Sequence, residues 1–157
     1  MLGLTRRTDY ALVAIAALAE AGPEPGAARS ARQVADAYGL PVPQTMNVLK
    51  DLQRAGIVHS TRGLHGGYRL AEAVERIPLL RVIEAIEGPV RMAVCCGEEE
   101  AEGAEPCVSC QTMTHCPITA GTRRLNEKIV GLLGAVTIRD LMESHVDVPL
   151  HAVTARS

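Results

Sequence analysis

Apolar residues recur every three or four positions in five stretches of the chain, which predicts a mainly helical fold. These stretches are the expected helices, at residues 5–21, 30–38, 43–55, 78–87 and 117–133. Two short runs at 57–61 and 68–71 favour β-strands, and the glycines between them favour a hairpin turn. A last helical turn or two is expected at 138–141, with Thr137 as its cap. The pattern therefore predicts a mainly α fold with one small β-hairpin.

Residues that begin or end helices mark the boundaries of the second and third helices. Ser30 and Gln33 have the spacing of a capping box, in which each side chain bonds the backbone N–H of the other residue. Gly39 and Gly56 are suited to ending the two helices, and Pro43 is suited to the first turn of the third. Two short helices joined by a tight turn are typical of a helix-turn-helix motif.

The third helix carries the expected base-reading side chains. Its apolar stripe, which we expect to face the core, consists of Val42, Met46, Leu49 and Leu52. In such motifs the second helix presents polar residues to base edges in the major groove. The predicted DNA-reading residues are Gln44, Thr45, Asn47 and Lys50. Gln and Asn can pair with adenine, and Lys can pair with guanine or phosphate.

The hairpin adds a second expected DNA contact. Arg62 and Arg69 flank its tip, where Gly66 and Gly67 let the backbone approach a phosphate or enter a minor groove. Arg6, before the first helix's apolar stretch, is a further basic residue that we assign to the same surface. On the pattern alone, the alternative is a protein-interaction module in which the pair of short helices packs with the β-hairpin.

Composition and charge sharpen this interpretation. A chain of 157 residues is one domain, or one domain with an appendage. It lacks Trp and Phe, so its core must use Ala, Leu, Val and Ile. Residues 1–70 hold eight Lys/Arg and five Asp/Glu, whereas residues 71–157 hold eight and thirteen. The net charge of −2 therefore hides a positive half, which we expect to face DNA.

The N-terminal stretch has some features of an export signal. Arg6 and Arg7 precede the apolar residues 11–19, but Asp9 interrupts the pattern and the helix is needed for the core. The stretch is also shorter than the ~18 residues of a membrane span. We therefore expect a cytoplasmic protein with no membrane partner.

Five cysteines lie within a short, Glu-rich segment in which no helical or strand period is present. They are Cys95, Cys96, Cys107, Cys110 and Cys116. In a cytosolic chain such a cluster favours metal or redox chemistry over disulfides. Grouped thiolates suit a soft metal or an iron–sulfur cluster. A zinc site around Cys107 and Cys110 and a sensor based on direct thiol oxidation are the alternatives.

Several strings of residues resemble the bacterial Rrf-type winged-helix regulators, the family that includes IscR, NsrR and RirA. The strings are LTRRTDYAL at 4–12, LPVP at 40–43, LKDL at 49–52, AGIV at 55–58, STRGLHGGYRLA at 60–71 and IEAIEGP at 83–89. The likeness extends over about residues 2–145, and the string at 60–71, the family's wing, is the most specific. It implies sequence-specific DNA binding by a homodimer that pairs long C-terminal helices, here 117–133.

The resemblance also implies a 2Fe–2S or 4Fe–4S cluster on the cysteine segment. Cys110 and Cys116 match the family's second and third ligands, and Cys95 matches the first, with Cys96 a close rival. The resemblance nominates Asp9 as the fourth ligand, reached across the dimer. The alternative is that Asp9 caps the first helix or is a first-turn carboxylate favoured by the helix dipole. Where some family members place a His ligand, this chain has Thr119.

These expectations combine into one organisation. Residues 1–90 form a winged helix-turn-helix domain, 91–116 a Cys-rich sensor loop, 117–144 a dimerisation helix with a short terminal helix, and 145–157 a flexible tail. The predicted function is a homodimeric repressor whose DNA affinity is switched by the cluster, and not an enzyme. The alternatives are a thiol-based regulator without a cluster, or a redox or interaction protein on the same fold that does not bind DNA.

Overall fold

The computed structural model describes residues 4–22, 28–63, 66–93, 96 and 116–143. Its helix α1 (Arg6–Glu20) lies in the centre of the core, and Thr5 caps its beginning by accepting a hydrogen bond from the Arg7 N–H. Ala11, Ala14 and Ala17 are fully buried along this helix. Their small side chains let neighbouring helices approach closely, which suits a core without Phe or Trp.

Helices α2 (Ala31–Tyr38) and α3 (Val42–Arg54) form the helix-turn-helix, and both pack against α1. The predicted capping box is present, with Ser30 and Gln33 bonding each other's backbone N–H at 3.2 and 2.8 Å. Gly39 ends α2 in the left-handed conformation, at φ 65°, that favours glycine. The second and third expected helices are therefore confirmed, with α3 beginning one residue earlier than predicted.

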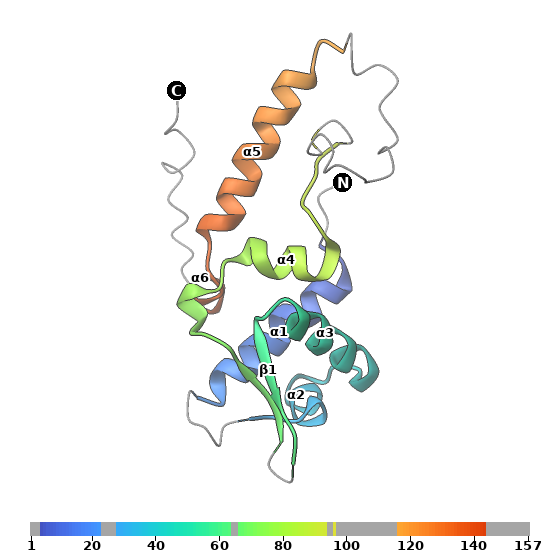
Figure 1. Cartoon of the computed structure of the whole chain (residues 1–157), viewed down its shortest axis with the longest axis vertical. Helices are drawn as coiled ribbons and strands as arrows, with labels where there is room; N and C mark the ends of the chain where they lie inside the picture. The colour runs from blue at the N-terminus through green and yellow to red at the C-terminus, as the bar shows by residue number, and fades with distance from the viewer. Residues whose placement is uncertain (1–3, 23–27, 64–65, 94–95, 97–115, 144–157) are drawn as a thin grey trace.

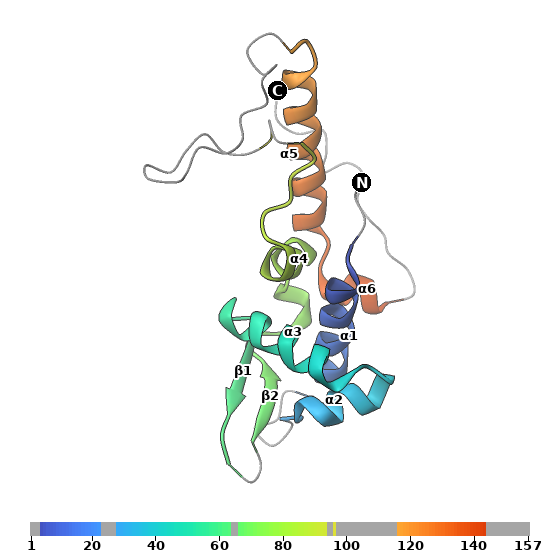
Figure 2. The ribbon, with the colours of Figure 1, turned by 90° about the vertical axis from the view of Figure 1, so that its right-hand side faces the viewer.

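Strands β1 (Val58–Thr61) and β2 (Gly67–Leu70) pair antiparallel and form the wing, with Val58 opposite Leu70. A third segment joins them, because Arg29 and Tyr68 exchange backbone hydrogen bonds of 3.0 and 2.8 Å. The wing is thus tied to the chain just before α2. Figures 1 and 2 show this head, made of α2, α3 and the hairpin, at the opposite end of the molecule from α5.

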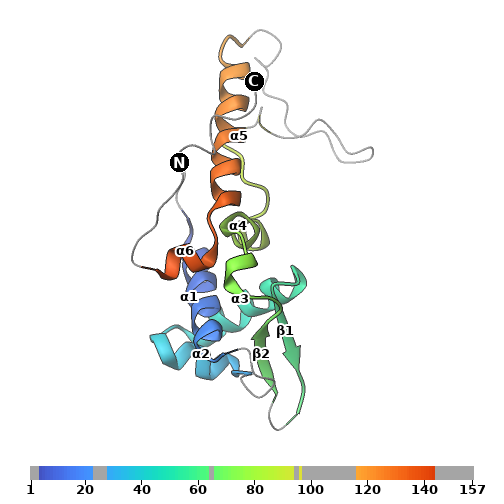
Figure 3. The same ribbon diagram turned by 90° about the vertical axis from the view of Figure 1, so that its left-hand side faces the viewer.

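Helix α4 (Leu79–Glu87) closes the core over α1 and α3, after a short 3₁₀ turn, η1 (Val74–Arg76), that was not predicted. Helix α6 (Ile138–Met142) packs against η1 and α1, as Figure 3 shows, and its Ile138 is buried in the main core. Backbone bonds from Leu79 N–H to Val136 O and from Ile138 N–H to Ile77 O fix this junction, at 2.8 and 3.0 Å. The short terminal helix therefore packs into the core of the winged-helix unit, whereas the sequence pattern groups it with the dimerisation helix.

Helix α5 (Thr119–Ala135) extends away from the rest of the molecule (Figure 1). It contacts α4 near its C-terminal end, where Leu133 packs with Leu79, Ile83 and Val136. None of the seventeen residues of α5, all of them described, is buried. It begins two residues later and ends two residues later than the helix predicted from the sequence. No helix in the described part of the chain has the length and apolar character to cross a bilayer.

Candidate nucleic-acid interface and cysteine segment

The buried side of α3 differs from the predicted stripe. Leu49 and Leu52 are buried as expected, but Thr45 and Val48 share that side, and Met46 is 41% exposed. Thr45 was predicted to read DNA, and that prediction is wrong for its side chain, which is fully buried. Its hydroxyl donates to the Pro41 carbonyl at 3.1 Å, so a polar group at this core position is satisfied within the helix.

The outward side of α3 keeps the other predicted residues together. Gln44, Asn47 and Lys50 are exposed, and they can reach a ligand laid along the helix. Met46 and Arg54 are also exposed on α3, and neither was among the predicted contacts. A four-residue spacing from Met46 to Lys50 and from Lys50 to Arg54 places these three along one edge of the helix. The exposed part of α3 is thus polar and basic, with one apolar side chain among its members.

Asp51 orients two of the basic groups near this side. Its carboxylate accepts from Arg7 of α1 at 2.8 Å and from Arg54 of α3 at 3.0 Å, and it is 19% exposed. The Arg7 and Arg54 side chains are more exposed, at 57% and 79%, so they remain available to phosphate. Arg6 is also exposed, at the start of α1. The i,i+3 spacing of Asp51 and Arg54 was a sequence signal for this cluster, whereas the contact with Arg7 depends on the fold.

On the wing, Arg62 and Arg69 are exposed, as expected for groups that contact DNA. The two glycines have a structural role that the sequence did not reveal. A Cβ at Gly67 would lie 2.7 Å from the Arg29 carbonyl carbon and oxygen, and one at Gly66 would overlap the Thr61 carbonyl oxygen. Close backbone packing within the head therefore accounts for glycine at both positions, before any approach to DNA is considered.

Arg81 of α4 holds the C-terminal end of α3. Its guanidinium donates to the carbonyl oxygens of Ala55 and Gly56, each at 3.3 Å, and forms an ion pair with Glu72. A cation at these carbonyls is favourable because they form the negative end of the helix dipole. The side chain therefore links α3 to α4 and to the segment after the wing.

Glu87, at the end of α4, holds the beginning of α1. The Thr5 hydroxyl and the Thr8 hydroxyl donate hydrogen bonds to its carboxylate, the latter at 2.5 Å. These bonds lower the pKa of Glu87 below its ordinary value, chiefly through Thr5 and then Thr8. Asp9, the nominated cluster ligand, is exposed in the same first turn of α1.

Two of the five cysteines are described, and both lie beside the first half of α5. Cys116 precedes the helix, and the Cys96 thiol donates to the Thr122 carbonyl at 3.7 Å. The Met92 N–H donates to Asn126 Oδ1 at 2.9 Å, so the segment carrying Cys96 follows α5 over one turn. Cys95, Cys107 and Cys110 lie outside the described residues, as do most of the expected sensor loop and all of the expected tail.

The surroundings of Cys116 favour its thiolate. The Thr119 side chain is the largest cause of a lowered pKa for this thiol, followed by the Ile118 backbone N–H. The Thr119 hydroxyl is itself buried and makes no well-aligned hydrogen bond with any described group. The Thr119 hydroxyl thus acts on the Cys116 sulfur as a nearby dipole, without the geometry of a full hydrogen bond. A thiolate is the form of cysteine that ligates metals and reacts with oxidants.

The described residues do not assemble a complete metal site. No group of three or more His, Cys, Asp or Glu side chains in the described part of the chain could hold an ion. Within one chain the helix that carries Asp9 and the helix that follows Cys116 also begin in different parts of the molecule. Figures 1 and 2 place the start of α1 beside α4, whereas α5 begins at the far end of the molecule.

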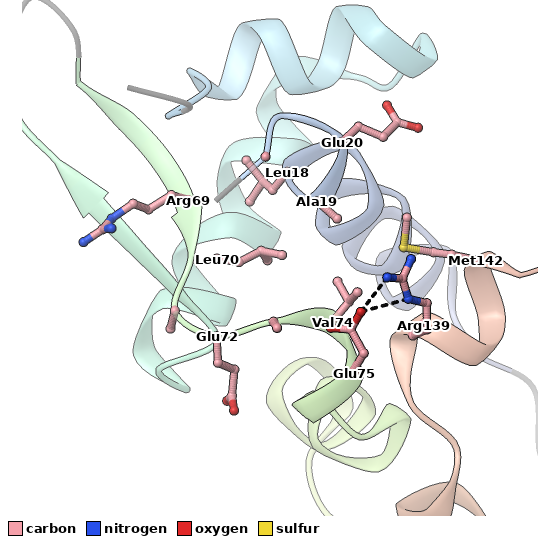
Figure 4. A pocket seen from close by; sticks show the side chains of 13 residues that line it. Leu18, Ala19, Glu20, Arg69, Leu70, Glu72, Val74, Glu75, Arg139 and Met142 are labelled. Atoms are coloured by element: carbon pink, nitrogen blue, oxygen red, sulfur yellow. Dashed lines mark hydrogen bonds and ion pairs between the residues drawn. The ribbon is translucent and has the colours of Figure 1, made fainter. Parts of the chain in front are cut away.

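A cavity of about 690 Å³ lies on another face, between the end of α1, residues 69–75 and α6 (Figure 4). Its floor is apolar and includes Leu18, Val74 and Met142. Glu75 and Arg139 line one side of it and form an ion pair, with Nη2 and Oε1 2.6 Å apart, so η1 and α6 are held together at this point. No Ser, Thr, Cys, His or Lys is among the described residues that line it.

Comparison with known proteins agrees with this arrangement. Residues 4–144 match the model of the Rrf2 family, described as iron-dependent transcriptional regulators. A putative rrf2-like HTH-type transcriptional regulator of Rhodobacter capsulatus is 28% identical over 140 residues, 88% of this chain and 91% of the relative. The HTH-type transcriptional regulator IscR of Xenorhabdus nematophila is 31% identical over 144 residues, 90% of this chain and 79% of the relative.

The fold is also shared with a solved regulator. The structure of CymR, the global cysteine regulator of B. subtilis, superposes with a TM-score of 0.62 at 25% identity, covering 90% of this chain and 96% of that one. The sequence match spans both the helix-turn-helix head and the long C-terminal helix, which are the two parts that the structure defines. The chain therefore belongs to the Rrf2 family of helix-turn-helix transcription regulators.

Proposed function

We propose that the protein is a homodimeric repressor that binds a roughly palindromic DNA operator through α3 and the wing. The observation that carries this proposal is the outward side of α3, where Gln44, Asn47 and Lys50 are exposed and Asp51 positions Arg7 and Arg54 beside them. Side chains of this kind hydrogen-bond to base edges and phosphates. Arg62 and Arg69 add basic groups from the wing at the same end of the molecule.

The homodimer rests on an apolar strip along α5. Ile118, Leu125 and Leu132 are spaced by seven residues, and Ile129 lies beside them on the same side of the helix. Ile118 is 67% and Leu125 is 47% exposed, so most of this strip has no partner within the described chain. A second copy of α5 would cover it and would place two reading heads on one operator.

An iron–sulfur cluster is the proposed regulatory group. Cys116, Cys110 and either Cys95 or Cys96 are its proposed ligands, with Asp9 contributed by the partner copy. The donor set fits such a group, because Cys116 favours the thiolate and Cys96 lies beside the same end of α5. The iron-dependent description of the family supports it. When bound, the cluster supplies sensitivity to oxidants, nitric oxide or iron supply.

The division of labour within the chain follows from these assignments. Residues 1–90 together with α6 act as the reading head, 91–116 as the sensor segment, and α5 as the dimer contact. Changes at the sensor segment reach the heads through α5, because this helix contacts both the segment around Cys96 and helix α4. A shift of the heads relative to each other removes base contacts worth about 1–3 kcal/mol each.

A regulator that senses through thiols alone is the second candidate. The lowered pKa of Cys116 favours it, because a thiolate is also the form that oxidants attack. The chain also shares its fold with CymR, which is described as a global cysteine regulator. This candidate binds DNA without metal and responds to peroxide.

DNA binding is tested by selecting sequences from a random duplex pool with the full-length protein and measuring the affinity of the winner against scrambled DNA. We expect at least ~10³-fold preference for the selected site and a steep loss of affinity with rising salt. Equal binding to both duplexes would contradict the proposal. The matched variants are Lys50→Ala, which removes a proposed contact, and Lys128→Ala, which removes a similar charge from α5.

The regulatory group is tested separately by anaerobic purification. We expect iron and acid-labile sulfide in the wild type, with visible absorption that is lost in Cys116→Ser and kept in Cys107→Ser. Protein without iron or sulfide that still binds the selected DNA, and releases it after peroxide treatment, would replace the cluster by the thiol mechanism.

A further inference from the structure

Met46 is an exposed apolar side chain in the second turn of α3. It is 41% exposed, while its neighbours Thr45 and Leu49 are fully buried. The other exposed residues of α3 are polar or proline, namely Pro43, Gln44, Asn47, Lys50, Gln53 and Arg54. Met46 is thus the one large hydrophobic residue on the exposed side of this wholly described helix.

Exposure alone does not explain this residue, because single apolar side chains are common on protein surfaces. Its position is the informative feature. Met46 lies one residue before Asn47 and four before Lys50, on the part of α3 that a helix-turn-helix protein inserts into the major groove. A side chain at this point is removed from water when DNA binds, so it must meet a group that suits a thioether.

The major groove offers one apolar group on its base edges, the C5 methyl of thymine. The remaining groups on the base edges are hydrogen-bond donors and acceptors. If Met46 covered them, they would lose their hydrogen bonds to water and gain none in return, which is unfavourable. The Met side chain is unbranched and flexible, and it adapts to small apolar surfaces. We propose that Met46 is a specificity-determining residue that selects thymine at one position of each operator half-site by packing on its methyl group.

This assignment rests on the proposed DNA-binding function and adds to it the identity of one base. A 5-methylcytosine carries the same methyl group at the same edge of the groove, so it presents the same chemistry. Thymine and 5-methylcytosine are distinguished in the experiment because each is introduced separately into the selected operator.

The test replaces thymines in the selected operator one at a time by deoxyuridine, which removes only the methyl group. With wild-type protein at fixed salt, we expect one position per half-site at which uracil weakens binding roughly fourfold, the factor for one buried methyl. Changing both half-sites together gives a loss of roughly fifteenfold. Cytosine at that position binds weakly, and 5-methylcytosine recovers part of the loss.

Two variants assign the effect to Met46. In Met46→Ala the ratio of affinities for thymine and uracil operators falls to about one at that position, while Met46→Leu keeps most of it. The control, Gln44→Ala, weakens binding to both operators and leaves the ratio unchanged. Because Met46 is exposed, the variants are expected to unfold at the wild-type temperature, which thermal denaturation checks.

Three results would overturn the assignment. A selected operator in which no thymine can be replaced by uracil with loss of affinity excludes it, and so does a Met46→Ala variant that keeps the full thymine preference. Both leave the proposed function intact, because DNA is still bound selectively. If the random pool yields no selected sequence at all, the proposed function fails and this assignment fails with it.

Discussion

Single side chains hold the ends of helices in this protein, and Glu87 shows how much one carboxylate contributes. It accepts hydrogen bonds from two threonine hydroxyls of α1, one of which, Thr8, is fully buried. A carboxylate at the beginning of a helix is also favoured by the helix dipole. Glu87 therefore fixes α1, which carries Arg6 and Arg7, relative to the end of α4.

Replacing Glu87 by Gln is expected to lower the free energy of unfolding at pH 7 by about 1 kcal/mol, a figure reduced for solvent screening because the residue is exposed. The folded-state pKa of Glu87 is lowered, so its ionised form is the one that stabilises the fold. This stabilisation is complete above the unfolded pKa of about 4.3 and is lost as the pH falls through the lower folded value.

Urea denaturation of both proteins between pH 3 and 7 measures this difference. The gap between wild type and variant should narrow as the pH falls below about 4. The control is Glu84→Gln, which changes an exposed residue of the same helix. Its free energy of unfolding should equal that of the wild type at every pH. If the difference in the free energy of unfolding between wild type and Glu87→Gln were the same at every pH, the amide would be destabilising for steric reasons. That result would contradict the electrostatic explanation.

The same scale explains which site residues could be predicted. Gln44, Asn47 and Lys50 were placed on the exposed side of α3 from residue type, because polar and charged groups favour water. For Thr45 and Met46 the sequence predicts the reverse of what is observed, since Thr45 is buried and Met46 is exposed. Polarity is a weak guide for a threonine whose hydroxyl bonds the carbonyl four residues earlier. Only the packing of α3 against α1 decides which of two adjacent positions faces the core.

At the level of elements, helix boundaries were the most predictable part of the fold. Ser30, Gln33, Gly39 and Thr137 act locally, and each has the cap role that the sequence indicated. The third segment of the wing and the placement of α6 were not predictable, because both depend on pairing between distant residues. Arg29 pairs with Tyr68, and Pro78 pairs with Thr137.

Arg81 is the element-scale contact with the clearest expected effect. Arg81→Met removes the cation that bonds two carbonyls at the end of α3 and leaves Glu72 without its partner. We expect the free energy of unfolding to fall by about 1–2 kcal/mol. We also expect the affinity for the selected operator to fall by more than this loss of stability explains, because the C-terminal end of α3 is no longer held in place. Urea denaturation and equilibrium DNA binding measure the two effects.

The matched control is Arg76→Met, which removes an exposed arginine from η1 that forms no ion pair with a described residue. It should change neither quantity beyond about 0.5 kcal/mol. If Arg81→Met lowers stability while the affinity of the folded protein is unchanged, Arg81 stabilises the head without positioning the base-reading helix.

At the scale of the whole molecule, the chain returns to its winged-helix unit after leaving it. Helix α5 begins far from α4 and runs back to it, and α6 then packs against η1 and α1, held by the Glu75–Arg139 ion pair (Figure 4). Both ends of α5 are therefore connected to described structure: Cys96 beside its first half, and α4 with α6 at its last turn. These contacts join α5 to the cysteine segment at one end and to the core at the other.

The apolar strip of α5 makes a prediction about assembly that is independent of the cluster. Leu125→Glu places a charge at the centre of the strip, where burial against a partner helix would leave it unpaired. We expect the variant to sediment as a monomer, whereas the wild type sediments as a dimer. Because Leu125 is 47% exposed in the single chain, the fold of each monomer should be retained.

Loss of the dimer should lower affinity for the palindromic operator by about 100-fold or more, because each head then binds its half-site alone. Affinity for an isolated half-site should be nearly equal in variant and wild type, which separates assembly from damage to the head. Glu127→Lys, a charge change on the opposite side of α5, should leave both the dimer and the operator affinity as they are. A Leu125→Glu protein that remains dimeric would move the interface away from α5, and the coupling between cysteine segment and operator would then need a route through the head itself.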